Sequence, residues 1–196
     1  MKKLSVCVLF GGVSPEHEVS LRSAESVLNN LNPEKYNIFP VGITRDGQWI
    51  LFGGSDYSML PNGTWESCPR NRRAALSPVR GQGLLSFEND CVVRERIDVV
   101  FPVLHGENGE DGSMQGLLQI AGIAYVGSGV GASSACMDKS MTKLIAQNAG
   151  IFVSENGNLD LLPVDEFFDQ HLLAVAQRVC HGKLQLLPAL RFGNAD

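Results

Sequence analysis

Two apolar runs, residues 4–10 (LSVCVLF) and 97–104 (IDVVFPVL), constrain the fold of this chain more than any other feature. Both are rich in β-branched residues, a composition typical of strands buried on both faces of a parallel sheet. Parallel strands need a crossover connection, which is usually a helix. A polar, Gly-rich loop follows each run, and loops at the carboxyl ends of strands form the binding site of an open α/β sheet. The chain is therefore predicted to be an α/β protein with a site at that edge.

Helical and extended patterns alternate around these runs, which indicates a mostly parallel sheet with helices on its faces. Asn32 and Pro33 stop the first helix, and Gly122 and Gly150 close the later ones. The predicted helices cover residues 17–31, 111–121 and 131–149, and further strands are predicted over residues 36–43 and 124–126.

The middle of the chain gives weaker signals. An Asp-Gly pair between apolar flanks predicts a hairpin over residues 43–51, and residues 84–94 have room for one or two short strands. Residues 53–83 are polar and rich in Gly, Pro, Ser and Asn, and we expect an insertion or a long loop of variable structure there. The basic cluster Arg70, Arg72 and Arg73 is predicted to belong to this solvated loop.

Length, charge and cysteine content exclude several classes of protein. The 196 residues suffice for one well-cored domain, or for one domain and part of a second. The net charge of −5 argues against a nucleic-acid partner. Five cysteines without a C-x-x-C pair indicate reduced thiols, and Cys7 is expected in the core. The first apolar run is too short for an export signal and no run is long enough for a membrane span, so we expect a cytoplasmic protein without a membrane partner.

The loop after the first run contains Gly11, Gly12, Ser14, Glu16 and Glu18, close to the expected start of a helix. Backbone amides at such a place bind anions, and glycine lets a ligand approach the main chain. The alternative is purely structural, with Ser14 as the N-cap and the two glutamates as favourable first-turn charges. The spacing is not G-x-G-x-x-G, so a dinucleotide site is unsupported.

The loop after the second run (HGENGEDG) places His105 and three carboxylates in eight residues. A histidine at the end of a buried strand suits contact with a substrate or a phosphate, although a structural role is the alternative. For Glu110 and Asp111 we favour the simple role of helix-start charges.

With their flanks, these segments resemble the D-alanine–D-alanine ligases. The matching motifs are G-G-x-S-x-E-x-x-V-S-L-x-S-A from Gly11 to Ala24, HGENGEDG-x-x-Q-G from His105 to Gly116, and Gly127-Ser128-Gly129 with SSACMDKSMTK from Ser133 to Lys143. The long first domain is most similar to the subgroup that contains the vancomycin-resistance D-Ala–D-Ser and D-Ala–D-Lac ligases. The resemblance implies a Rossmann-like pre-ATP-grasp domain.

The resemblance also implies an activity and its site residues. Such ligases use ATP and Mg²⁺ to phosphorylate the carboxylate of one D-alanine, and the amine of a second D-alanine then displaces phosphate to give a peptidoglycan dipeptide. Glu16 matches the carboxylate that holds the ammonium of the first D-alanine. His105 matches the histidine near the carboxylate of that substrate, and Lys139 matches a lysine that reaches ATP.

The resemblance divides the chain into three parts. Residues 1–128 match the N-terminal ligase domain, residues 129–153 match the start of the ATP-grasp domain, and residues 154–196 form a divergent tail. We find no family magnesium ligands in that tail, so no metal-binding residue is assigned. A truncation or a change of reading frame is the preferred hypothesis for the tail, and we expect no measurable ligation by this chain alone.

Two other functions stay open at this point. One is a non-catalytic remnant or dimerisation module, because members of the family are commonly homodimers through this domain. The other is a Rossmann-like small-molecule-binding domain with an unrelated function. Phosphate release that depends on ATP and D-alanine separates the ligase from both, and the molecular mass in solution separates the other two.

Overall fold

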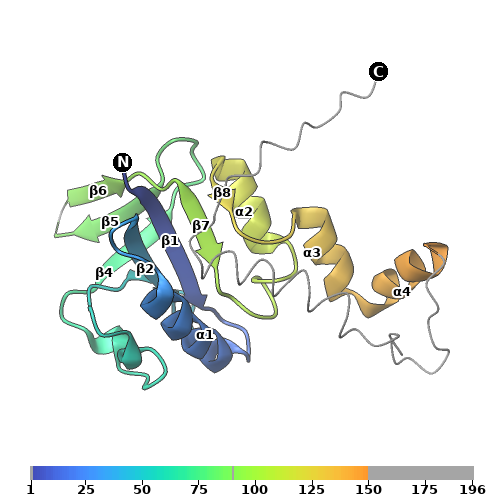
Figure 1. The fold of residues 1–196 in the computed structure, drawn as a ribbon, viewed down its shortest axis with the longest axis horizontal. Helices are drawn as coiled ribbons and strands as arrows, with labels where there is room; N and C mark the ends of the chain where they lie inside the picture. Colours follow the sequence, from blue (N-terminus) through green and yellow to red (C-terminus); the bar gives the residue numbers. More distant parts are fainter. Residues whose placement is uncertain (1, 90, 150–196) are drawn as a thin grey trace.

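The computed structural model describes residues 2–89 and 91–149. In this part of the chain, a mixed sheet of eight strands has the order β6-β5-β4-β3-β2-β1-β7-β8 (Figure 1). Strands β2, β1, β7 and β8 are parallel, and β3 to β6 continue the sheet as antiparallel neighbours. The predicted α/β class is confirmed, and the parallel half of the sheet carries both Gly-rich loops.

The first three elements agree with the predicted ranges to within one residue. The strands are β1 (Leu4–Gly11), β2 (Tyr36–Ile43), β3 (Trp49–Leu51), β4 (Arg72–Leu76), β5 (Leu84–Glu88), β6 (Cys91–Glu95), β7 (Val99–Pro102) and β8 (Ala124–Tyr125). The helices are α1 (His17–Asn30), α2 (Ser113–Ala121), α3 (Val130–Met137) and α4 (Lys139–Asn148), with short 3-10 helices η1 (Tyr57–Met59) and η2 (Trp65–Ser67).

Strand β1 is buried on both faces, as its apolar run predicts. Cys7 and Leu9 belong to the core that also contains Leu118 of α2. Val8 and Phe10 belong to the core on the other face, which α1 covers. Full burial of each such side chain contributes about 1.5–3 kcal/mol. The predicted core position of Cys7 is confirmed, and burial raises the pKa of its thiol.

The prediction of a variable loop over residues 53–83 is wrong. This segment contains η1, η2 and β4, and it places Trp65 in the core edge-on to Phe10, with their ring centroids 5.2 Å apart. The indole lies so close to the sheet that a Cβ atom at Gly42 would come within 2.3 Å of it. The insertion is therefore a packed part of the fold.

The basic cluster is also placed differently from the prediction. Arg72 and Arg73 lie in strand β4, and Arg72 forms an ion pair of 3.3 Å with Glu88 of the neighbouring strand β5. Pairing of β4 with β3 and β5 holds these residues in an extended conformation. The local composition alone does not indicate this strand.

The helix predicted over residues 131–149 is two helices, α3 and α4, separated at Asp138. The carboxylate of Asp138 accepts hydrogen bonds from the backbone N–H groups of Ser140 (2.8 Å) and Met141 (3.0 Å), so it caps the second helix. We call α3 and α4 the helical arm and residues 2–128 the sheet domain. Figure 1 shows the arm extending away from the sheet.

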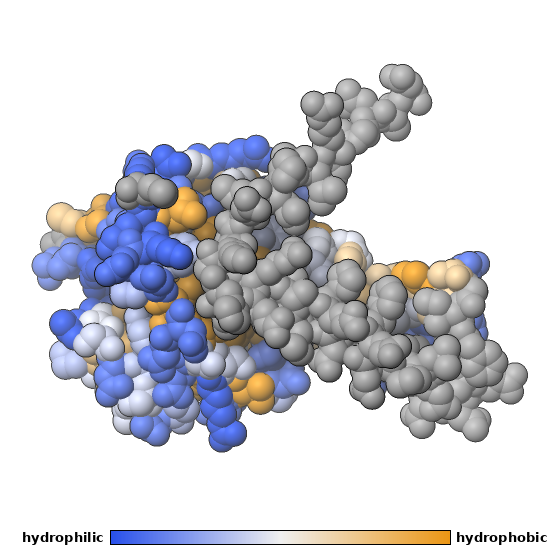
Figure 2. All heavy atoms as spheres, in the orientation of Figure 1, coloured by the Kyte–Doolittle hydropathy of each residue, from blue (hydrophilic) through white to orange (hydrophobic). Residues whose placement is uncertain are grey.

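The arm has an apolar surface. Helix α4 buries none of its residues, and Met141, Leu144 and Ile145 are each at least half exposed. Figure 2 shows apolar surface over this arm beside polar surface. Within the two described ranges, no helix is long and apolar enough to cross a membrane.

Candidate functional site

The first loop, residues 11–16, leaves the carboxyl end of β1 with a backbone that only glycine adopts easily. Gly11 and Gly12 have φ angles of 83° and 102°. A Cβ atom at Gly11 would lie 2.2 Å from the carbonyl oxygen of Ile43, and the N–H of Gly12 donates to that same oxygen at 2.8 Å. The glycine pair therefore lets the loop turn tightly against the end of β2.

Ser14 and Glu16 form the turn that enters α1. The buried hydroxyl of Ser14 accepts a hydrogen bond from the backbone N–H of Glu16 at 3.0 Å, and the Ser14 carbonyl accepts one from His17 at 3.1 Å. Glu16 occupies the N-cap position of α1, but its carboxylate makes no capping hydrogen bond. The exposed Glu16 carboxylate is thus left available for a ligand.

His17 and Glu18 have structural roles next to this turn. The imidazole of His17 is buried, and its Nδ1 lies 2.7 Å from the carbonyl oxygen of Gly12. A carbonyl only accepts, so Nδ1 carries the proton and fastens the loop to the helix. Glu18 lies in the first turn of α1 and forms an exposed ion pair of 2.9 Å with Arg45, as a surface charge does.

The second loop, residues 105–112, connects β7 to α2. Asp111 accepts hydrogen bonds from the backbone N–H groups of Asn108 and Ser113, both at 2.9 Å, which confirms its helix-start role. Partial burial acts to raise the pKa of Asp111, but these N–H donors outweigh it and hold the pKa below its usual range. The Glu110 carboxylate instead turns back into the loop, where its Oε2 accepts from the N–H of Gly106 at 2.7 Å.

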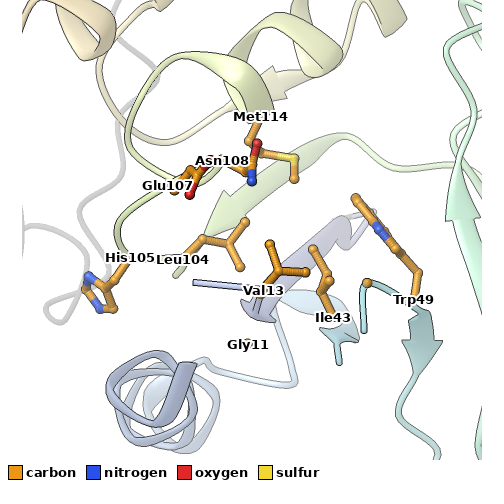
Figure 3. Close-up of a pocket in the computed structure, with 12 residues that line it drawn as sticks. Gly11, Val13, Ile43, Trp49, Leu104, His105, Glu107, Asn108 and Met114 are labelled. Atoms are coloured by element: carbon orange, nitrogen blue, oxygen red, sulfur yellow. The ribbon is translucent and has the colours of Figure 1, made fainter. Parts of the chain in front are cut away.

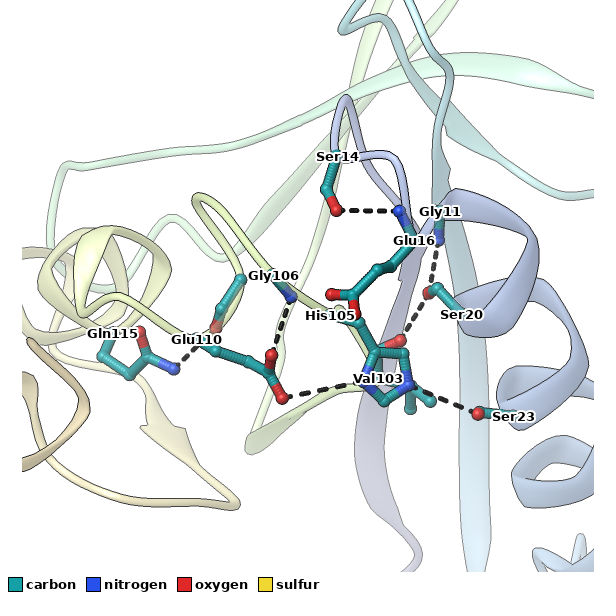
Figure 4. Close-up of polar contacts among 11 residues, drawn as sticks. Gly11, Ser14, Glu16, Ser20, Ser23, Val103, His105, Gly106, Glu110 and Gln115 are labelled. Atoms are coloured by element: carbon teal, nitrogen blue, oxygen red, sulfur yellow. Dashed lines mark hydrogen bonds and ion pairs between the residues drawn. The ribbon is translucent and has the colours of Figure 1, made fainter. Parts of the chain in front are cut away.

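The two loops meet at the carboxyl edge of β1 and β7. The close-up in Figure 4 shows the Glu16 carboxylate directed toward the His105–Gly106 segment. A Cβ atom at Gly106 would come within 2.6 Å of Glu16 Oε2 and 2.7 Å of Ser14 Oγ, so the loops approach closely here, and the φ of 68° also favours glycine. The structure therefore brings Glu16 and His105 to one place, as the sequence analysis predicts.

A buried serine joins the elements that carry the two loops. The hydroxyl of Ser20, in α1, accepts from the N–H of Gly11 at 2.8 Å and donates to the carbonyl of Val103. The last direct backbone hydrogen bond between the two segments runs from the N–H of Val103 to the carbonyl of Leu9 at 2.8 Å, and the Ser20 hydroxyl bridges them beyond that point. Ser20 thus sets the separation of the two strand ends (Figure 4).

A pocket of about 210 Å³ opens beside this meeting point (Figure 3). Its walls are the first loop, the β2–β3 turn and the second loop. Its larger side chains come from Val13, Ile43, Trp49, Leu104, His105, Glu107, Asn108 and Met114. Most of these side chains are apolar, so the pocket suits a small apolar group. Glu16 is not part of the lining, and Figure 3 shows the imidazole of His105 directed away from the other lining side chains.

Lys139, the predicted ATP contact, lies elsewhere. It is the first residue of α4 and is exposed. It is absent from the pocket lining and from the polar contacts of the two loops drawn in Figure 4. The sheet domain therefore groups two of the three predicted site residues, and the third belongs to the helical arm.

No metal centre is found in the described part of the chain. Residues 2–89 and 91–149 contain no group of three or more His, Cys, Asp or Glu side chains that could hold a metal ion. Three nearby carboxylates have other partners: Glu110 contacts a backbone N–H and His105, Asp111 accepts from backbone N–H groups, and Glu18 pairs with Arg45.

Three residues of the site are not identified by the sequence reasoning: Ser20, Ser23 and the Glu110 carboxylate in its contact with His105. The hydroxyl of Ser23 lies 3.3 Å from Nε2 of His105, and Oε1 of Glu110 lies 3.6 Å from Nδ1. Ser20 and Ser23 belong to the V-S-L-x-S motif, where a spacing of three residues places them on one side of a helix. That spacing could have indicated two serines facing the same neighbour. Their partners, Val103 and His105, become known only when β7 is placed beside β1.

Comparisons with known proteins identify this arrangement. A family model described as the D-ala D-ala ligase N-terminus matches residues 5–128. The D-alanine–D-alanine ligase of Thermoanaerobacter sp. is 46% identical over 156 residues, which cover 77% of this chain and 42% of that protein. The vancomycin B-type resistance protein VanB of Enterococcus faecalis is 44% identical over 156 residues, covering 79% and 43%.

A solved structure shares the fold as well. The crystal structure of VanG D-Ala:D-Ser ligase from Enterococcus faecalis matches with a TM-score of 0.73 and 39% identity, over 79% of this chain and 44% of that one. The chain thus spans a little over two fifths of the length of the curated relatives named above. The family match covers more than half of the chain and coincides with the sheet domain, so the chain belongs to the D-alanine–D-alanine ligase family through that family's N-terminal part.

Proposed function

We propose that the sheet domain forms the D-alanine-binding wall of an ATP-dependent ligase that makes a D-alanyl dipeptide for peptidoglycan. The observation that carries the proposal is the meeting of the uncapped Glu16 carboxylate with the His105–Gly106 segment at the carboxyl edge of the parallel strands. Membership of the ligase family supports it.

The residues at this edge suit a small zwitterion. Glu16 supplies a fixed negative charge for the ammonium group, and charge-assisted hydrogen bonds of this kind are about twice as strong as neutral ones. His105 supplies an N–H donor for the carboxylate that becomes the acyl phosphate, and such a donor stabilises the negative charge that develops there. The adjacent apolar pocket accommodates a methyl group.

ATP supplies the phosphoryl group that activates this carboxylate, and the attacking amine then displaces phosphate. Lys139 is exposed at the start of α4, and a cation there would contact the phosphates of ATP. The residues of the two described ranges do not fit a magnesium site, so we assign no ligand to Mg²⁺ and derive no step through it.

The test is a titration of the ¹⁵N-labelled chain with D-alanine, followed by NMR. We expect shifts confined to residues of the two loops, with a dissociation constant on the order of 1–10 mM, because one wall provides few contacts to a ligand of this size. Glu16→Gln should weaken binding at least fivefold. Glu18→Gln is the matched control, since Glu18 lies two positions away and pairs with Arg45.

Two results would overturn the proposal. One is the absence of any D-alanine-dependent shift in the two loops at about 50 mM ligand, a concentration well above the expected dissociation constant. The other is equal loss of binding in Glu16→Gln and Glu18→Gln, which would assign the effect to general surface charge. L-Alanine in a parallel titration shows whether the wall selects the D enantiomer.

Homodimerisation through this domain stays a prediction of the family resemblance. Light scattering of the purified chain across a concentration series tests it directly. A mass of one chain at every concentration would contradict it.

A further inference from the structure

We infer that Glu110 is a positioning residue for His105, and that it fixes the tautomer and the orientation of the imidazole ring. The inference rests on the proposed function, in which His105 faces the substrate. It concerns the second loop alone, where the sequence predicts only a helix-start charge for Glu110.

The first observation is that the loop itself holds the Glu110 carboxylate. Its Oε2 accepts the backbone N–H of Gly106 at 2.7 Å, a short hydrogen bond for an N–H donor. Gly106 directly follows His105, and its φ of 68° turns the chain so that this N–H faces back toward Glu110. This hydrogen bond limits the positions that the other carboxylate oxygen can take.

The second observation is the target of that other oxygen. Oε1 of Glu110 lies 3.6 Å from Nδ1 of His105, and the imidazole is about one-third exposed. An ionised carboxylate accepts hydrogen bonds and donates none, so it favours the proton on Nδ1. The opposite nitrogen, Nε2, lies 3.3 Å from the Ser23 hydroxyl, which can donate to it or accept from it.

Each nitrogen of the ring therefore has a fixed neighbour, the Glu110 carboxylate of the second loop beside Nδ1 and the Ser23 hydroxyl of α1 beside Nε2 (Figure 4). The 3.6 Å between Nδ1 and Glu110 is longer than a hydrogen bond, so the Nδ1–H stays available to the substrate carboxylate. The His105 ring thus contacts α1 through Ser23, and Glu16 is the N-cap residue of the same helix. A ring that is fixed in advance loses less rotational freedom on binding a ligand, so affinity for the ligand increases.

Glu110→Gln is the variant that isolates this role. A glutamine keeps the shape of the side chain and still offers an oxygen to the N–H of Gly106, so the loop stays closed. It removes the charge next to Nδ1. Asp111→Asn is the matched control, because Asp111 is the neighbouring carboxylate and serves the start of α2 instead.

The measurement is the pair of ring ¹⁵N shifts of His105, recorded on the whole chain at pH 9, above the ordinary titration range of imidazole. A His105→Gln sample assigns the signals. We expect the wild-type protein and Asp111→Asn to show predominantly the Nδ1–H tautomer, and Glu110→Gln to show a mixture. D-Alanine binding should weaken about fivefold in Glu110→Gln and stay unchanged in Asp111→Asn.

Unchanged ring shifts in a folded Glu110→Gln protein would overturn the inference. A changed tautomer with unchanged D-alanine affinity would support the positioning of the ring and would refute the substrate role of His105. Ser23→Ala gives a second test, because loss of the Nε2 partner should keep the Nδ1–H tautomer. A switch of tautomer in Ser23→Ala would contradict the assignment to Glu110.

Discussion

The sheet domain and the helical arm differ in how far they are packed. In the sheet domain, β1 is buried on both faces, and even the polar insertion sends Trp65 into a core. In the arm, α4 buries none of its residues and exposes Leu144 and Ile145. The three predicted site residues therefore lie on elements that are packed to different extents. The domain that carries Glu16 and His105 has its own cores, whereas the helix that carries Lys139 presents an apolar face to solvent.

The largest expected effect distinguishes the two regions by stability. Phe10→Ala removes a fully buried ring that packs against Trp65, and we expect a loss of about 3–5 kcal/mol in the free energy of unfolding. Leu144→Ala in the arm removes a side chain that is 60% exposed, so the change should stay within about 0.5 kcal/mol. Urea unfolding measures both, and similar losses for the two variants would break the comparison.

A smaller effect is expected at the bridge between the strand ends. Ser20→Ala leaves the N–H of Gly11 and the carbonyl of Val103 buried without this partner, and we expect a cost of about 2–3 kcal/mol. Ser26→Ala is the control, since Ser26 is an exposed residue of the same helix. Urea unfolding of both variants measures the cost. Equal stabilities of Ser20→Ala and Ser26→Ala would show that the Ser20 hydroxyl does not stabilise the junction of the two strand ends.

The smallest effect concerns pH and the opposite edge of the sheet. The backbone N–H of Ser5 donates to Asp98 at 2.9 Å and, with the nearby Arg96 guanidinium, holds the pKa of Asp98 below its usual range. A lowered folded-state pKa contributes stability above the unfolded value of about 3.9, and this contribution is lost as the pH falls through the folded value. Wild-type protein should therefore lose its advantage over Asp98→Asn as the pH falls below about 4 and through the lowered folded-state pKa.

Unfolding free energies of the two proteins, measured from pH 6 down to pH 2, test this sign. A constant difference across the range would contradict it. Amide exchange in α4 should not respond to Asp98→Asn, because Asp98 contacts β1 and Arg96 and lies outside the arm.

Local sequence patterns are sufficient to predict the parallel half of the sheet. The continuous apolar run of β1, the helical spacing of α1 and the Asn32-Pro33 stop fix those boundaries without tertiary information. Strand β4 and the packing of Trp65 are not predictable in this way, because β4 depends on its pairing with β3 and β5 and Trp65 depends on the space above Gly42. The break at Asp138 has a local signal, an aspartate that caps the following helix, which the longer helical pattern obscures.

The site likewise contains residues that local sequence patterns indicate and residues whose contacts depend on the tertiary structure. Gly-rich loops after buried strands are sufficient to indicate Glu16 and His105, since loop position follows from strand order. The contacts of Ser20 and Ser23 join residues 83 and 82 positions apart, so they depend on β1 and β7 being neighbours. The contacts of Glu110 stay within the second loop and depend on the path of its backbone. The roles of Glu16, His105 and Lys139 toward D-alanine and ATP stay predictions that the experiments above address.

The central claim is that the sheet domain alone builds the D-alanine wall. The direct measurement is a D-alanine titration by NMR of a protein ending at Ser128, beside the same titration of the whole chain. We expect a folded domain in which the NMR signals of the two loops shift in the same pattern as in the whole chain. The two dissociation constants should agree within about twofold, a difference of well under 1.4 kcal/mol in binding free energy. A folded domain whose loops do not respond to D-alanine, while those of the whole chain do, would contradict the claim.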